Sequence, residues 1–233
     1  MNGPTRRDWL RALTALSLAI PTLAAAQVAP SPAEVGRFGP LHAAAHRGDL
    51  DTVRHLARDP ALRESRDAHG RTPLHVATFA RQRGSIKALL AAGADTAALE
   101  HGRYDAVTIA AVAGDEETLR VLLGNGASAR LITSRYDGTA LIAAAHLGHE
   151  GVVRQLIAAG APLDHVNNLG WTALIESIVL GDGGPRHQAT LRALLEAGAS
   201  TKQTDSSQRT PLRLARERGY AAMVQVLEAA GAP

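Results

Sequence analysis

The segment Thr72-Pro73-Leu74-His75-Val76-Ala77 recurs along this chain at a nearly constant interval. Related six-residue segments begin at Gly39, Asp105, Thr139, Thr172 and Thr210, so successive starts are offset by 33, 33, 34, 33 and 38 residues. A sequence period of roughly 20–50 residues predicts an array of repeated structural units. The alternative is an ordinary helical bundle with accidental spacing. Such a bundle does not require six similar segments at a nearly constant interval.

A second pattern follows the first in every unit. Two apolar residues stand three positions apart, at Val53/Leu56, Ile86/Leu89, Leu119/Leu122, Val153/Leu156, Leu191/Leu194 and Val224/Leu227. This spacing places both residues on one face of a helix. A glycine suited to a left-handed helix end follows at Gly93, Gly126, Gly160, Gly198 and Gly231. Each unit therefore contains a second helix, and stacked neighbours would cover its apolar face.

The T-P-L-H-x-A segment with a period near 33 residues resembles the ankyrin repeat, a hairpin followed by two helices. The resemblance implies an all-α repeat solenoid of about six ankyrin repeats over residues 38–233. Charged residues replace Ala or apolar residues in the last unit, at Arg213, Arg216, Glu217 and Arg218. We interpret this unit as a cap, because a terminal repeat needs a polar outer face.

Composition indicates a folded chain without a nucleic-acid footprint. Of the 233 residues, 45% are hydrophobic and 20% charged, which is typical of a globular protein. The formal net charge is +3, and residues 1–26 supply +2 of it. The remaining +1 is too small for electrostatic binding of nucleic acid. Cysteine is absent, so no disulfide can stabilise the fold.

Residues 1–26 have the features of a cleavable signal peptide. Thr5-Arg6-Arg7-Asp8-Trp9-Leu10-Arg11 precedes a short apolar run and Ala24-Ala25-Ala26. The paired arginines resemble the twin-arginine export motif, with Trp9 and Arg11 as conservative departures. An ordinary export signal with two adjacent arginines is the alternative. Either route predicts export, and the twin-arginine route implies the bacterial periplasm.

Residues 27–37 contain two prolines, and we interpret them as a linker between the leader and the repeats. No membrane span is expected after cleavage, and we expect the mature chain to be a monomer.

The resemblance to ankyrin repeats also implies where a protein partner would bind. In that family the hairpin tips and the exposed face of each first helix form a concave groove. The matching positions that we select are Phe79, Tyr104, Arg135, Tyr136, His146, Leu147, Leu169, Trp171, Leu180 and Arg209. Five of the six aromatic residues after the leader fall on groove positions, and aromatic and arginine side chains dominate protein-binding hot spots.

Two features leave this interpretation open. The aromatic rings could instead pack between adjacent hairpins and brace the array. Arg103 and Gln208 stand where a tip glycine is expected, so those two hairpins could differ in shape.

The fifth unit is five residues longer than its neighbours. The two registers place the insertion within residues 181–189, between its helices. Loops that project from a rigid scaffold often carry function, so Asp182, Arg186 and His187 form a candidate second contact surface. A tolerated insertion without function is the alternative, because the added closure entropy is small.

The sequence does not indicate catalysis or a cofactor. The ten histidines include His42 and His75, which the resemblance implies hydrogen-bond to neighbouring backbone. No H-E-x-x-H or G-x-S-x-G motif occurs. We therefore expect no enzymatic activity, no metal and no cofactor.

The leading hypothesis is a non-enzymatic protein–protein interaction scaffold of the bacterial periplasm. Two alternatives are an exported effector that acts outside the cell and an envelope protein that binds a ligand or a metal.

Overall fold

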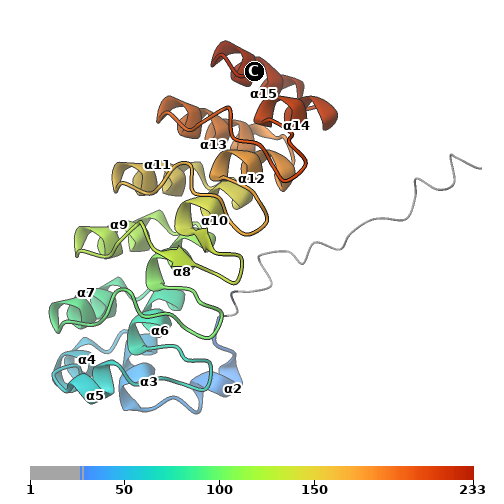
Figure 1. Cartoon of the computed structure of the whole chain (residues 1–233). Helices are drawn as coiled ribbons and strands as arrows, with labels where there is room; N and C mark the ends of the chain where they lie inside the picture. Colours follow the sequence, from blue (N-terminus) through green and yellow to red (C-terminus); the bar gives the residue numbers. More distant parts are fainter. Residues whose placement is uncertain (1–26, 28) are drawn as a thin grey trace, which may run out of the picture.

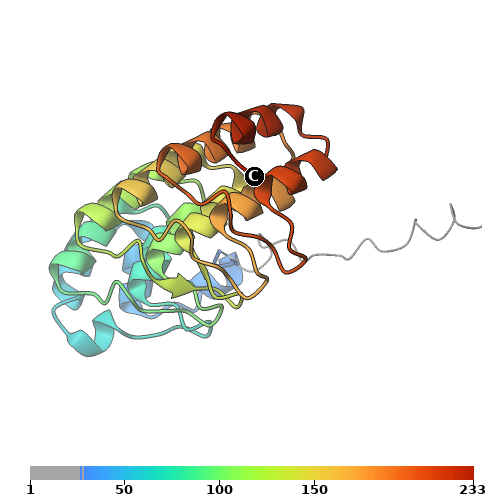
Figure 2. The same ribbon diagram turned by 45° about the horizontal axis from the view of Figure 1, so that its top comes forward.

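The computed structural model describes residue 27 and residues 29–233. The predicted leader, residues 1–26, lies outside the described residues. Six helix pairs follow one another in a single stack (Figure 1). The two helices of each pair lie in separate rows, and the connecting hairpins project along one edge (Figure 2). The all-α repeat solenoid of six units is confirmed.

We call the first helix of each pair the inner helix and the second the outer helix. The inner helices are α3 (Pro40–Arg47), α6 (Pro73–Phe79), α8 (Ala106–Val112), α10 (Ala140–Leu147), α12 (Ala173–Val179) and α14 (Pro211–Glu217). The outer helices are α4 (Leu50–Leu56), α7 (Arg83–Ala91), α9 (Glu116–Gly124), α11 (Glu150–Ala158), α13 (Pro185–Glu196) and α15 (Ala221–Ala229).

Four short elements complete the described part of the chain. They are α2 (Pro32–Val35), α5 (Pro60–Arg63), β1 (Ile132–Thr133) and β2 (Gly138–Thr139). The two strands pair antiparallel within the hairpin of the fourth repeat, with Ile132 opposite Thr139 and Thr133 opposite Gly138.

Side-chain caps explain where the inner helices begin. Thr72 and Asp105 are N-caps, and each side chain accepts a hydrogen bond from the backbone N–H three residues later. Thr139, Thr172 and Thr210 repeat the arrangement. The five glycines expected after the outer helices all have positive φ angles, between 72° and 91°. The repeated sequence segments therefore mark helix boundaries as well as a period.

The core runs the length of the stack. Ten of the twelve paired apolar residues of the outer helices are fully buried. The two exceptions, Leu56 and Val224, lie in the first and last repeats and stay half-buried, because a terminal repeat has a neighbour on one side only. Ala144 and Ala145 are completely buried in α10, where a small side chain lets adjacent inner helices approach closely.

The hairpins of the third and sixth repeats make the same turn as those of the second and fifth, although Arg103 and Gln208 replace the tip glycine. Arg103 and Gln208 adopt φ angles of 66° and 60°, in the left-handed region that Gly70 and Gly170 occupy in their own hairpins. A side chain is strained there, at a cost of about 1–2 kcal/mol. The expected difference in hairpin shape is therefore not found.

The predicted linker at residues 27–37 contains structure. Ser31 caps the short helix α2 through a reciprocal capping box with Glu34. Glu34 also forms ion pairs with His69 and Arg71 in the second repeat. This part of the chain is therefore attached to the array and does not act as a free spacer.

The insertion in the fifth repeat lies between its helices, as its two sequence registers indicate. It lengthens α13 to 12 residues, whereas α7, α9, α11 and α15 have nine each. Much of the insertion is thus an extra helical turn rather than a projecting loop. Within residues 27 and 29–233, no helix has the length and apolar character needed to cross a membrane.

Candidate functional site

Each hairpin is closed by one polar side chain near its start. In the fifth repeat, Asn167 Oδ1 accepts hydrogen bonds from the backbone N–H groups of Leu169 and Trp171, both at 3.0 Å. Asp67 and Asp205 make the same pair of bonds in the second and sixth repeats. These local bonds favour the turn and fix the direction of the tip residues.

Backbone hydrogen bonds join the tips of successive hairpins. The His101 N–H donates to the His69 carbonyl at 3.0 Å, and the Ser134 N–H donates to the Arg103 carbonyl at 2.7 Å. The Asn168 N–H donates to the Tyr136 carbonyl at 2.9 Å. Side chains at equivalent tip positions are thereby arrayed along one edge of the stack.

The predicted site residues of the fourth and fifth repeats remain accessible. Arg135 is exposed, and the others are half-buried: Tyr136, His146, Leu147, Leu169, Trp171 and Leu180. Trp171 and Leu180 rest against the core, so part of each side chain is held in place and part faces solvent. We call these seven residues the repeat 4–5 surface. A surface of partly immobilised apolar groups loses little conformational entropy when a partner binds.

Tyr104 is not available to a partner, contrary to the sequence interpretation. It is only 2% exposed, and its ring lies against Gly102 and the tip of the next repeat, near Tyr136. Burial raises the pKa of its hydroxyl. For this residue the alternative, a ring packed between adjacent hairpins, is right.

Two other selected positions lie apart from the repeat 4–5 surface. Phe79 is half-buried at the end of α6 in the second repeat. Arg209 in the last repeat is tied to Asp205 at 2.6 Å and to Glu217 at 3.3 Å. Arg209 thus supports its own hairpin.

The candidate residues of the insertion contact the preceding repeat. The ring of His187 is hydrogen-bonded to the Asp182 carboxylate at 2.8 Å and to the backbone carbonyl of His146 at 2.9 Å. Arg186 donates to the Leu147 carbonyl at 2.7 Å. These bonds join α13 to the end of α10, so the insertion braces two repeats, while Asp182 and Arg186 remain exposed.

Sequence reasoning missed Glu176, which replaces an apolar residue. The equivalent residues are Ala43, Val76, Ile109, Ala143 and Leu214. Glu176 is completely buried, and its Oε1 accepts a hydrogen bond from Asn167 at 2.9 Å. Its Oε2 and His146 Nδ1 lie 3.7 Å apart, and neither has a hydrogen-bond partner among the residues that the structure describes. The sequence did contain a signal for this residue, because Glu176 is the charged residue at a repeat position that is apolar in the other five units.

Burial acts on both members of this pair. It raises the pKa of Glu176 to about 8 and lowers the pKa of His146, a direction that the nearby charge of His187 reinforces. Both groups are consequently neutral near pH 7. The repeat 4–5 surface therefore has, at His146 and the buried Glu176 next to it, polar atoms without a net charge.

Two exposed apolar residues were also missed. Ile132 is 50% exposed and Val166 is 44% exposed, each five residues after the small residue that opens its hairpin. They occupy equivalent positions in the fourth and fifth repeats, beside the tips. The signal was present in the sequence, because a partly exposed hairpin edge usually carries polar side chains.

The prediction that His42 and His75 are hydrogen-bonded to neighbouring backbone is confirmed. The ring Nε2 atoms of His42 and His75 are hydrogen-bonded to the carbonyls of Arg71 and Tyr104 in the next hairpin, at 2.9 and 3.1 Å. In the part of the chain that the structure describes, no three His, Asp or Glu side chains converge in a way that could hold a metal ion.

A family model for ankyrin repeats (three copies) matches residues 22–100 and 107–205. The chain is an ankyrin repeat protein. It is 37% identical over 190 residues to the ankyrin repeat protein YahD of Escherichia coli K12, an alignment that covers 81% of this chain and 94% of YahD. It is 32% identical to human ankyrin repeat and SOCS box protein 16, of which it spans only 43%.

Solved ankyrin structures show the same fold. An ankyrin repeat domain from Acinetobacter baumannii AYE superimposes with a TM-score of 0.78 and 43% identity, over 83% of this chain and 98% of that domain. The ankyrin repeat domain of Bcl-3, a member of the IkappaB protein family, gives a TM-score of 0.75 with 27% identity, over 84% of this chain and 87% of that one. The ankyrin repeat is a protein–protein interaction module.

Proposed function

We propose that this ankyrin protein is a non-enzymatic scaffold of the bacterial periplasm, and that it holds a protein partner on the repeat 4–5 surface. The observation that carries the proposal is the partial exposure of Tyr136 and Trp171 on hairpin tips that are joined by a backbone hydrogen bond from Asn168 to Tyr136. Rigid aromatic groups bury a large area at a small entropic cost, which is typical of binding hot spots.

The neighbouring residues fit the same role. Leu169 and Leu180 add apolar area, and Ile132 and Val166 extend it along the hairpins. Arg135 is exposed and makes no ion pair within the described residues, so its guanidinium is available to a carboxylate of the partner. Aromatic groups at the centre and a cation at the rim are the usual arrangement of a protein interface.

The test begins with crosslinking and affinity capture from periplasm, followed by calorimetry on the captured protein. Trp171→Ala and Tyr136→Ala should each weaken binding by about 2 kcal/mol, which is roughly 30-fold. Arg135→Ala should weaken it less. Arg120→Ala, an exposed arginine on the outer helix α9, is the matched control and should change nothing.

The proposal fails if the Trp171→Ala/Tyr136→Ala double variant stays folded and retains full affinity. Loss of capture by the double variant, with capture retained by Arg120→Ala, would support it.

The periplasmic location is tested separately. N-terminal sequencing of the exported protein should begin at Gln27, because the A-x-A pattern predicts cleavage after Ala26. Replacing both Arg6 and Arg7 by Lys should leave the precursor inside the cell. Normal export of that variant would exclude the twin-arginine route, and an uncleaved cytoplasmic product of the natural chain would contradict the location itself.

A further inference from the structure

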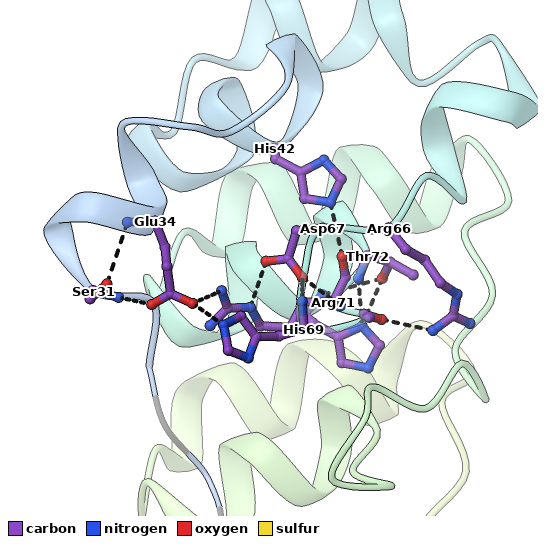
Figure 3. A network of polar contacts seen from close by, with 10 residues as sticks. Ser31, Glu34, His42, Arg66, Asp67, His69, Arg71 and Thr72 are labelled. Atoms are coloured by element: carbon purple, nitrogen blue, oxygen red, sulfur yellow. Dashed lines mark hydrogen bonds and ion pairs between the residues drawn. The ribbon is translucent and has the colours of Figure 1, made fainter.

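The tip of the second hairpin holds a carboxylate. Glu34 Oε1 accepts a hydrogen bond from Arg71 Nη2 at 2.9 Å and forms an ion pair with His69 Nε2 (Figure 3). Both of these side chains belong to the second repeat, whereas Glu34 comes from α2, more than 30 residues earlier in the chain. The contact therefore joins the segment before the repeats to the edge of hairpin tips.

Arg71 is held in place without Glu34. Its side chain is 3% exposed, and its Nε donates to Asp67 Oδ2 at 2.7 Å. Asp67 Oδ1 in turn accepts hydrogen bonds from the backbone N–H groups of His69 and Arg71, at 2.8 and 2.9 Å. One side of the guanidinium is thus fixed by its own hairpin, and Nη2 is presented to a second carboxylate.

The helix that supplies Glu34 lies at the surface of the array. Helix α2 has four residues, and none of them is buried. Hydrogen bonds from Ser31, together with the charge of Arg71, lower the pKa of Glu34 to about 2, so the carboxylate is ionised. The Arg71–Glu34 ion pair lies largely out of solvent, because the two side chains are 3% and 17% exposed. Release of α2 would break this ion pair, but it would remove no buried residue from the apolar core.

A cavity of about 400 Å³ adjoins this contact. Phe38, Leu41 and Leu62 supply apolar lining, and Arg66 and His69 lie at its polar part. Elsewhere in the stack a preceding hairpin donates or accepts backbone hydrogen bonds on this side, as His69 and His101 do. Among the described residues, α2 and Phe38 stand on this side of the second hairpin, where the other repeats have a preceding hairpin.

We propose that the Arg71–His69 tip and the adjoining cavity form a binding site for an acidic peptide segment of a protein partner, and that Glu34 occupies this site from within the same chain. Arg71 and His69 bind a carboxylate of the segment, and the cavity takes the side chain beside it. This site lies at the opposite end of the stack from the repeat 4–5 surface and does not depend on it.

Because Glu34 occupies the site, a partner peptide needs enough affinity to compete with it. A segment attached to the same chain acts at an effective concentration in the millimolar range. An acidic peptide must therefore bind more tightly than α2 does, or α2 must be released first. Two carboxylates cannot share Arg71 Nη2 and His69, so the competition is direct.

The probe is a fluorescein-labelled peptide with the sequence of residues 29–38, APSPAEVGRF, measured by fluorescence polarisation against the full chain. The natural protein should bind it weakly, because its own Glu34 fills the site. Glu34→Ala in the protein should increase affinity for the peptide about tenfold or more. A peptide with Glu34→Gln should lose that gain, since the amide cannot replace the carboxylate.

Two protein variants locate the binding. His69→Ala in the Glu34→Ala background should reduce affinity several-fold, because His69 is an exposed ligand whose loss leaves the hairpin intact. Glu117→Ala, which removes a different exposed carboxylate paired with an arginine, should bind the peptide like the natural protein. Circular dichroism and the urea midpoint of each variant establish that it is folded.

The proposal is wrong if Glu34→Ala fails to bind the peptide at millimolar concentration, if it binds no better than the natural protein, or if the Glu34→Gln peptide binds equally well. None of these results bears on the repeat 4–5 surface, whose partner is measured independently through Trp171 and Tyr136.

Discussion

At the scale of single residues, the array contains an ionisable side chain at a repeat position that is apolar in the other five units. Glu176 is a buried carboxyl without a countercharge, and its Oε2 lacks a hydrogen bond. Removing a carboxylate from water is costly, so the group keeps its proton instead. Because Glu176 lies in the fifth repeat next to His146 of the fourth, its protonation contributes to the stability of these two repeats.

Replacing Glu176 by Gln should remove a pH dependence. Glu176 titrates near 4.5 in an unfolded chain and near 8 in the folded protein. Between these values the folded state holds a proton that the unfolded state has released, so the free energy of unfolding falls as pH rises, by up to about 1.4 kcal/mol per pH unit. Glu176→Gln cannot titrate, retains the acceptor for Asn167, and should be relatively more stable at pH 8 than at pH 5.

Urea denaturation of both proteins at pH 5, 6.5 and 8 checks this. Glu116→Gln, on the exposed start of α9, is the control and should follow the natural protein. An unchanged pH slope in Glu176→Gln would show that another group is responsible.

Gln208 is strained in the left-handed region, with φ at 60°, and its exposed side chain makes no hydrogen bond within the described residues. Gln208→Gly should therefore stabilise the protein by about 0.5–1 kcal/mol, because relief of strain exceeds the entropy cost of glycine. Gln203→Gly, in the same hairpin but outside the left-handed region, should destabilise it. Thermal denaturation of both variants measures the difference, and equal shifts would contradict the role of strain.

At the scale of elements, one recurring contact joins the last three outer helices, α11, α13 and α15, to the repeat before each. The residue just before or near the start of the outer helix places its side chain over the end of the preceding inner helix. His149 is hydrogen-bonded to the Val112 carbonyl at 3.2 Å, and His187 to the equivalent His146 carbonyl. Tyr220 donates to the Gly181 carbonyl at 2.9 Å. The insertion in the fifth repeat preserves this contact, since His187 keeps its register with Leu191.

His187→Ala should destabilise the array by about 1–3 kcal/mol, because it leaves the His146 carbonyl without its hydrogen-bond partner in a partly buried place. Asp182→Ala should cost less, since that carboxylate is exposed and only supports the ring. Hydrogen exchange should report faster opening at the end of α10 in His187→Ala. If Asp182→Ala proves the costlier change, the insertion acts through its loop and not through the contact between repeats.

At the scale of the whole molecule, stability is distributed along a one-dimensional stack. Each repeat contacts its neighbours only, so a defect at the end can be confined there, whereas a defect at the centre interrupts the array. Leu122 in the third repeat and Leu227 in the sixth are both completely buried. They are therefore matched in chemistry and burial and differ in position along the stack.

Leu122→Ala should lower the free energy of unfolding by about 2–5 kcal/mol, the usual cost of a large-to-small change in a core. Leu227→Ala should lower that of the main transition less, because the last repeat can unfold alone. Urea denaturation followed by circular dichroism compares them. A larger loss in Leu227→Ala would contradict the assignment of the sixth repeat as a cap.

The sequence by itself determined the number of repeats, the ends of their helices and most of the core. These properties depend on signals within one unit: the capping Thr or Asp, the apolar pair three residues apart and the left-handed glycine. Because the six units repeat the same local pattern, each confirms the others. The positions of Tyr136 and Trp171 on hairpin tips follow from the same register.

The tertiary structure alone decided which neighbour each side chain meets. The burial of Tyr104, the proximity of Glu176 to His146 and the capture of Glu34 by Arg71 all join groups some 30 or more residues apart in the chain. A repeat pattern assigns such residues to a position within a unit. It does not show which residues of the adjacent unit differ from the consensus. Whether a tip side chain faces solvent or a neighbouring repeat depends on these differences, because packing between repeats depends on the particular side chains that are in contact.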